Sequence, residues 1–157
     1  MPTYIIWQDL DGHIHAEVPA PKGRREGESE IAWVERVAKK TEAIHLAEGR
    51  TRLANHEEAF PSRTFRNCWR ESGGKIEVDM PLARVQRMTE IRAQRDVLLQ
   101  ASDGDKARLD DIGSGPAKSA IAAYRQTLRD LPATVDVESI TTPEALEAFA
   151  PTFPEKP

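Results

Sequence analysis

Two stretches with helical apolar spacing lie close together in the second half of this 157-residue chain, and they constrain its fold more than any other feature. The first stretch, residues 81–101, has an apolar face made of Leu82, Val85, Met88, Ile91 and Leu98. The second, residues 116–131, has an apolar face made of Ala120, Ile121, Tyr124, Leu128 and Leu131. Pro132 is expected to end the second helix, because proline lacks the N–H that a helix needs. Two amphipathic helices this close in sequence are expected to pack as an antiparallel helical hairpin.

The segments between and after these helices are rich in turn-forming residues. Residues 102–115 contain many Ser, Asp and Gly residues, which predicts a loop with one short helical turn around 107–112. After Pro132 the chain is expected to be extended, except for a short helix over 142–149 that begins with a threonine cap and a proline. Three further prolines near the C-terminus predict a polyproline-like end.

The first half of the chain predicts two β-hairpins and one helix. Residues 3–7 and 13–18 flank an Asp-Gly turn, and residues 65–69 and 76–78 flank a Gly-Gly turn. Between the hairpins, Ser29 is a good cap for a helix that reaches about residue 47. Because a two-stranded hairpin is only marginally stable in water, we expect this helix to cover the apolar face of the first hairpin.

The predicted fold class is therefore α+β. A small β-hairpin plus helix occupies residues 1–49, and residues 50–62 form a connector. Residues 63–132 form a second β-hairpin followed by the antiparallel helical hairpin, and residues 133–157 form an extended, proline-rich tail with one short helix.

Composition excludes several classes of protein. The 22 basic and 26 acidic residues give a formal charge of -4, which argues against general nucleic-acid binding, since phosphate binding requires concentrated positive charge. A single cysteine excludes an internal disulfide framework and any multi-cysteine metal site. The N-terminus lacks the pattern of a signal peptide, and no stretch approaches the roughly 20 apolar residues of a membrane span. We therefore expect a soluble protein of a reducing cytoplasm, with no membrane partner.

The sequence holds few residues that suggest catalysis or metal binding. His13 and His15 are two residues apart on a predicted strand, so they face the same way as Asp11 and Glu17 and could chelate a divalent metal. The alternative is a polar strand edge facing solvent. Cys68 is expected to be a half-buried strand residue and not a nucleophile. Because the sequence shows no acid–base pair, nucleophile motif or cofactor motif, we expect no catalytic residue, no resident metal and no cofactor, and a small enzyme or metal protein stays a third alternative.

Arginines on the first predicted helix are the main candidate binding residues. The set consists of Arg84, Arg87, Arg92 and Arg95. Such a face could bind an acidic protein surface or a nucleic-acid backbone, or it could be a solvated face paired with Glu90 and Asp96. On the next helix, Tyr124, Arg125 and Arg129 form either an anchor cluster for a partner or a core tyrosine with two surface charges.

Four sequence blocks resemble a known family. Two are short: Arg63 to Trp69 and Val78 to Arg84. The other two are Ile91-Arg-Ala-Gln-Arg-Asp-Val-Leu-Leu99 with Ser102-Asp103, and Tyr124-Arg-Gln-Thr-Leu-Arg-Asp-Leu-Pro132. Together they resemble the tail assembly chaperone family of tailed bacteriophages, and the resemblance covers residues 63–132.

This resemblance implies a non-enzymatic phage tail protein that binds a tail or tail-fibre protein, either as a small structural subunit of the virion or as a tail assembly chaperone. It also implies a place in the bacterial host cytoplasm during assembly or in the virion tail, with homo-oligomers within the assembly. The implied partner-binding residues are Arg92, Arg95, Tyr124, Arg125 and Arg129. Asp96 and Asp130 also recur in the family, which implies that some Arg/Asp pairs close the helical hairpin. The alternative function is a nucleic-acid-binding accessory protein that uses the arginine face of helix 81–101.

Overall fold

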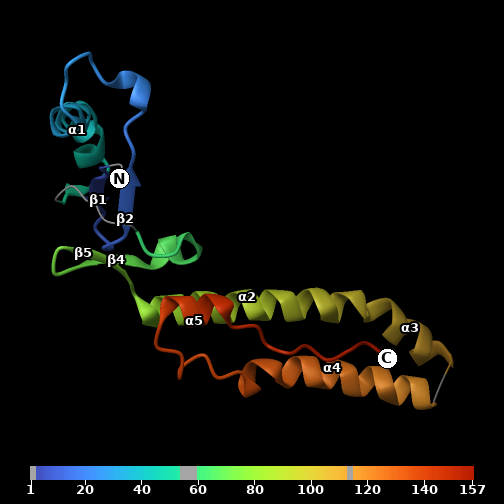
Figure 1. Ribbon diagram of the computed structural model, residues 1–157. Helices are drawn as coiled ribbons and strands as arrows, with labels where there is room; N and C mark the ends of the chain where they lie inside the picture. Colours follow the sequence, from blue (N-terminus) through green and yellow to red (C-terminus); the bar gives the residue numbers. More distant parts are fainter. Residues whose placement is uncertain (1–2, 54–59, 113–114) are drawn as a thin grey trace. The chain divides into compact units, whose positions relative to one another are not determined.

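The computed structural model describes residues 3–53, 60–112 and 115–157, and the chain divides into two compact units, residues 1–79 and 80–157 (Figure 1). Unit 1 holds small antiparallel sheets and one long helix, whereas unit 2 is helical, so the predicted α+β class is confirmed. The second hairpin belongs to unit 1, although the sequence grouped it with the helices. Much of the expected connector lies outside the described residues. In the described ranges, no helix combines the length and the apolar character of a membrane span.

A three-stranded antiparallel sheet forms the centre of unit 1. Strands β1 (Ile5–Gln8) and β2 (Ile14–Glu17) make the first predicted hairpin, and Gly12, with φ of 81°, occupies its turn. A short strand β3 (Thr51–Arg52) pairs with the other edge of β1 and gives the strand order β2-β1-β3. This third strand lies where the sequence predicted only a connector.

Both faces of this sheet are covered, because alternate residues of β1 point to opposite sides. On one face, helix α1 (Glu30–Ala47) packs against the sheet in an apolar cluster of Ile5, Trp7, Trp33, Val34 and Ala38. The predicted cap is confirmed, since Ser29 Oγ accepts from Ala32 N at 3.2 Å. A 3₁₀ turn, η1 (Pro21–Gly23), precedes this helix.

The second hairpin covers the opposite face of the sheet. Strands β4 (Trp69–Ser72) and β5 (Lys75–Val78) are joined by two glycines with positive φ, and the cluster contains Ile6, Ile14, Trp69 and Ile76. The prediction that this first strand begins at Phe65 is wrong. Residues Arg63–Cys68 form a 3₁₀ helix, η2, because the Ser62 side chain accepts from Thr64 N and starts a helical turn. Cys68 is accordingly a buried residue at the end of η2, not a half-buried strand residue.

Unit 2 contains the predicted antiparallel pair of helices, α2 (Met80–Ala101) and α4 (Pro116–Thr134) (Figure 1). The loop predicted between them is largely a third helix, α3 (Asp103–Ile112). Its first turn carries two aspartates, which favour a helix N-terminus electrostatically, and this offsets the unfavourable glycine at 104. The prediction that Pro132 ends α4 is also wrong. The proline lies in the last turn, where Val135 N still donates to Leu131 O.

The C-terminal tail packs along the two long helices and determines which face of α2 is buried. Helix α5 (Pro143–Ala148) begins at the predicted threonine cap, and its Leu146 is fully buried. On α2, Ala83 and Ile91 are buried, whereas Leu82 and Val85, expected in the core, are 37% and 64% exposed. The buried face of α2 is therefore rotated from the one that apolar spacing predicts.

Candidate functional site

Two arginines of α2 bind the C-terminal tail through its backbone. Arg84 donates from Nε and Nη2 to the carbonyl oxygen of Ile140, at 3.2 and 2.7 Å. One turn further, Arg87 donates to the carbonyl oxygen of Phe149 and also to Glu90. At the far end of the tail, Lys156 pairs with Asp105 and lowers the pKa of that carboxyl group. These contacts hold the tail along unit 2 from residue 140 to residue 156.

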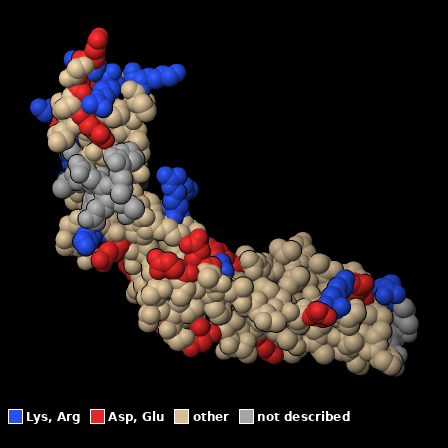
Figure 2. Space-filling view, in the orientation of Figure 1, with Lys and Arg blue, Asp and Glu red and all other residues tan. Residues whose placement is uncertain are grey.

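The face of unit 2 that carries the tail is mostly uncharged beyond α5, whereas acidic side chains gather near α5 itself (Figure 2). Phe149, Pro151 and Phe153 are half-buried there, so they present both packed and exposed apolar surface. An uncharged surface with aromatic and proline side chains is typical of the centre of a protein interface.

Arg125 joins three helices from its position on α4. Its Nη1 lies 2.8 Å from the carbonyl oxygen of Leu99, 2.5 Å from Ser102 Oγ and 2.7 Å from Asp103 Oδ1. Its side chain is only 11% exposed, and Ser102 is completely buried. The guanidinium therefore neutralises the carbonyl end of α2 and binds the first carboxylate of α3. This is an Arg/Asp pair that closes the helical hairpin.

Tyr124 and Arg95 also have most of their surface engaged within unit 2. Tyr124 is 6% exposed, beside the buried Ile121 and Leu128 of the same helix face. Arg95 donates from Nε and Nη2 to the neighbouring Asp96, at 2.9 and 2.7 Å. Tyr124 thus takes the core position that was one of the two alternatives for it.

Arg92 and Arg129 differ from the other three predicted site residues. Both are exposed, and within the described parts of the chain neither side chain makes a hydrogen bond or an ion pair. Across the same residues, no hydrogen bond joins Arg92 or Arg95 to the three predicted site residues of α4. The structure thus leaves two of the five predicted guanidinium or phenol groups available at the surface of unit 2.

Asp110 of α3 forms a second set of ion pairs, one of which links two helices. It accepts from Lys106 at 2.6 Å within its own helix and from Lys118 of α4 at 2.9 Å. These two ammonium groups lower the pKa of Asp110 to about 2. The carboxylate therefore stays ionised, and keeps both contacts, down to strongly acidic pH.

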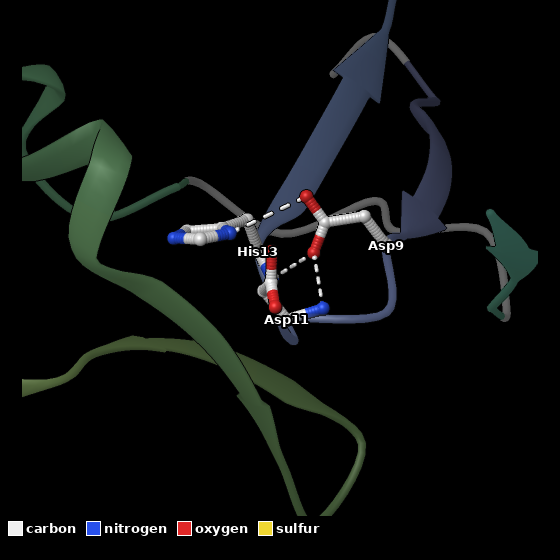
Figure 3. A group of neighbouring side chains, drawn as sticks. All are labelled: Asp9, Asp11 and His13. Carbon is white, nitrogen blue, oxygen red and sulfur yellow. Dashed lines mark hydrogen bonds and ion pairs between the residues drawn. The ribbon is translucent and has the colours of Figure 1, made fainter. Parts of the chain in front are cut away.

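In unit 1, Asp9 organises the turn that carries the two predicted metal-ligand histidines (Figure 3). Its Oδ1 accepts from the backbone N–H groups of Asp11 and His13 at 3.0 and 2.8 Å, which is the pattern of an Asx turn. Its Oδ2 lies 3.3 Å from His13 Nδ1 and 3.2 Å from His15 Nε2. Desolvation raises the pKa of Asp9, but the hydrogen bonds from His15 and the turn outweigh it and bring that pKa to about 2.

The structure does not bring all of the predicted metal ligands together. Glu17 does not join the other residues, since it accepts from His45 Nε2 of α1 at 2.7 Å and from Trp7 Nε1 at 3.4 Å. Among the described residues, Asp9, Asp11 and His13 are the group that brings three ligand atoms within 4.8 Å of one another, and hydrogen bonds of the turn account for their proximity. The arrangement is that of a structured turn.

Sequence reasoning missed the role of Arg84 and Arg87, which were expected either to bind a partner or to lie on a solvated face. Their acceptors are backbone carbonyl groups more than fifty residues away, and such acceptors leave no mark in residue identity.

No curated protein and no solved structure matches the chain. One family does match part of it, and the matched range begins inside α2 and includes α3, α4, α5 and most of the docked tail. This range extends further toward the C-terminus than the resemblance over 63–132, and it contains all five predicted site residues. Residues 88–156 match the family described as phage tail assembly chaperone protein, which supports a role in phage tail assembly.

Proposed function

We propose that this chain is a non-enzymatic phage tail protein that binds another tail or tail-fibre protein through unit 2. The observation that carries the proposal is the family match over residues 88–156, because that range coincides with the helices and docked tail of one compact unit. The chain acts in the host cytoplasm during tail assembly, either transiently or as a subunit that stays in the virion tail.

Exposed side chains of unit 2 support protein binding. Arg92 and Arg129 present guanidinium groups that have no partner among the described residues, and Val85 and Val97 are each 64% exposed on α2. Arginine beside apolar surface is a common composition for the centre of an interface. Tyr124 and Arg125 are largely buried within unit 2, where Arg125 holds α4 to the end of α2 and the start of α3.

The contacts that arginines of α2 make within unit 2 weaken the alternative that the chain binds nucleic acid. Of the four arginines on α2, Arg84 and Arg87 donate to the tail and Arg95 pairs with Asp96. Phosphate binding needs several free cationic groups on one face. Arg92 alone does not provide such a face.

Affinity capture from phage-infected cells tests the proposal. We expect the tagged chain to retain a tail or tail-fibre protein, identified by mass spectrometry. Arg92→Glu combined with Arg129→Glu is expected to reduce that capture about tenfold, because two charge reversals replace favourable pairs by repulsive ones.

The matched control is Lys39→Glu with Lys40→Glu, which makes the same change in charge on the exposed surface of α1 in unit 1, outside the family match. This control is expected to capture the tail protein normally. Absence of every tail and tail-fibre protein from the captured fraction would contradict the proposal. The protein inventory of purified virions then separates a retained subunit, which is present, from a transient chaperone, which is absent.

A further inference from the structure

A groove in unit 1 runs along the outer edge of β2 and lies entirely outside the family match. Its volume is about 980 Å³, and the second wall is formed by η2 and the residues just before it. The apolar residues that line the groove include Ile14, Ala16, Val18, Phe60 and Trp69. The groove is thus an elongated apolar surface with a β-strand along one side.

The β2 edge offers to this groove backbone groups that are unpaired within the part of the chain that the structure describes. Asp9 N donates to His13 O, which makes that pair a hydrogen-bonded one, and in an antiparallel ladder such pairs alternate with pairs whose backbone groups point outward. Ile14 and Ala16 are therefore the outward-facing residues of β2. The Leu53 N to Ile6 O bond agrees with this register, since it shows that Ile6, the partner of Ala16, directs its carbonyl toward β3.

Charge on the wall opposite β2 is positive and unneutralised. Arg63 and Arg66 line the groove and are exposed, and their side chains form no ion pair or hydrogen bond with any other described residue. They are three residues apart in η2, which is kinked at Phe65, and both line the same wall of the groove. The acidic groups at the groove, Asp9 and Glu17, are already engaged by histidines.

A buried donor at the groove also lacks an acceptor. Trp69 is 7% exposed, stacks on Phe60 with ring centroids 4.9 Å apart, and lines the groove. Its indole Nε1 is buried without a hydrogen-bond partner in the described residues. A buried donor of this kind favours a ligand that brings an oxygen acceptor.

We propose that this groove binds an extended, acidic segment of a partner protein, which adds to the sheet as a strand beside β2. Backbone hydrogen bonds to Ile14 and Ala16 provide affinity that does not depend on sequence, as in other cases of strand addition. Arg63 and Arg66 select acidic side chains, and a carbonyl or carboxylate oxygen of the segment accepts from Trp69 Nε1. The site is independent of the function proposed for unit 2, and it gives the chain a second binding surface.

Two labelled decapeptides test this proposal on the full-length chain. One alternates valine with glutamate, and the other alternates valine with lysine, so both favour a strand and only their charge differs. In fluorescence anisotropy we expect binding of the glutamate peptide and none of the lysine peptide. Hydrogen exchange at the Ile14 and Ala16 amides is expected to slow about tenfold on binding, because these two N–H groups become paired.

Two sets of variants locate the site. The double variant Arg63→Glu with Arg66→Glu is expected to reduce the affinity for the glutamate peptide about tenfold. The control variant Lys39→Glu with Lys40→Glu is expected to leave that affinity unchanged. Ala16→Pro removes the outward N–H without breaking the β1–β2 ladder and is expected to abolish binding, and Ala16→Ser retains it.

Equal binding of both peptides would overturn the charge selection. Peptide binding that survives both Ala16→Pro and the double arginine variant would show that the peptide does not bind in this groove. Pairing of two copies of the chain through β2, with exclusion of the peptide, would also overturn the proposal. None of these outcomes bears on capture of a tail protein by unit 2, so the two proposals fail separately.

Discussion

Leu146→Ala is expected to destabilise unit 2 by about 3 kcal/mol, the typical cost of removing a fully buried leucine side chain and leaving a cavity. Leu146 has no exposed surface, and it is the buried anchor of a six-residue helix. A helix this short does not form on its own in water, so α5 depends on docking against α2. Losing the anchor therefore releases the tail as well as leaving a cavity.

The two units can be followed separately in this experiment. All three tryptophans, at positions 7, 33 and 69, lie in unit 1, so tryptophan fluorescence during urea unfolding is expected to be unchanged by Leu146→Ala. Segment-resolved hydrogen exchange of α2, α4 and α5 measures unit 2. Val97→Ala is the control, because Val97 is 64% exposed and its truncation is expected to cost less than about 0.5 kcal/mol. Equal effects of the two variants would mean that the tail is not packed as described.

Arg125→Ala is expected to destabilise unit 2 by about 2 to 3 kcal/mol, because it removes a charged donor from the completely buried Ser102 and from the carbonyl oxygen of Leu99. Leu99 O, Ser102 Oγ and Asp103 Oδ1 all lose their contact with the guanidinium. Arg125→Lys is expected to recover only part of this loss, since an ammonium group cannot reproduce the planar geometry of the guanidinium.

Arg129→Ala is the matched control, because it removes an exposed arginine from the same helix. Its expected effect on the free energy of unfolding is within about 0.5 kcal/mol. Hydrogen exchange of α2 and α4 measures the stability of unit 2 in both variants. If Arg125→Ala proved as harmless to stability as Arg129→Ala while tail-protein capture was lost, Arg125 would be a contact residue and not a residue that positions the helices.

Local signals in the sequence were sufficient for the elements that depend on neighbouring residues. Ser29 and Thr142 cap their helices as predicted, and the Gly73–Gly74 turn joins β4 and β5. In each case the side chain or backbone conformation acts within three residues of itself. The confirmed α+β class follows from such signals.

Elements that depend on distant residues were not predictable in the same way. Strand β3 exists because β1 offers it a free edge, and α3 forms where a Ser-Asp-Gly sequence suggested a loop. The rotation of α2 arises because Arg84 and Arg87 find acceptors in the tail. A polar residue that is buried through a distant backbone carbonyl looks the same in sequence as one that faces solvent.

The candidate site contains residues whose position could be predicted from local sequence and residues whose position depends on distant contacts. Tyr124 shares helical spacing with Ile121 and Leu128, so its burial agrees with the apolar pattern of α4. Arg125, one residue later, has no such pattern, and its contacts require the end of α2 to be placed beside it. Arg92 and Arg129 are left at the surface, which could not be deduced before the packing of the helices was known.

Disruption of the gene for this chain in the phage or prophage that encodes it tests the proposed role most directly. Electron microscopy then counts tailed particles and tailless capsids, with and without the chain supplied from a plasmid. We expect capsids without functional tails in the disrupted phage and recovery of tailed particles on complementation. A normal yield of infectious, tailed particles in its absence would contradict a role in tail assembly.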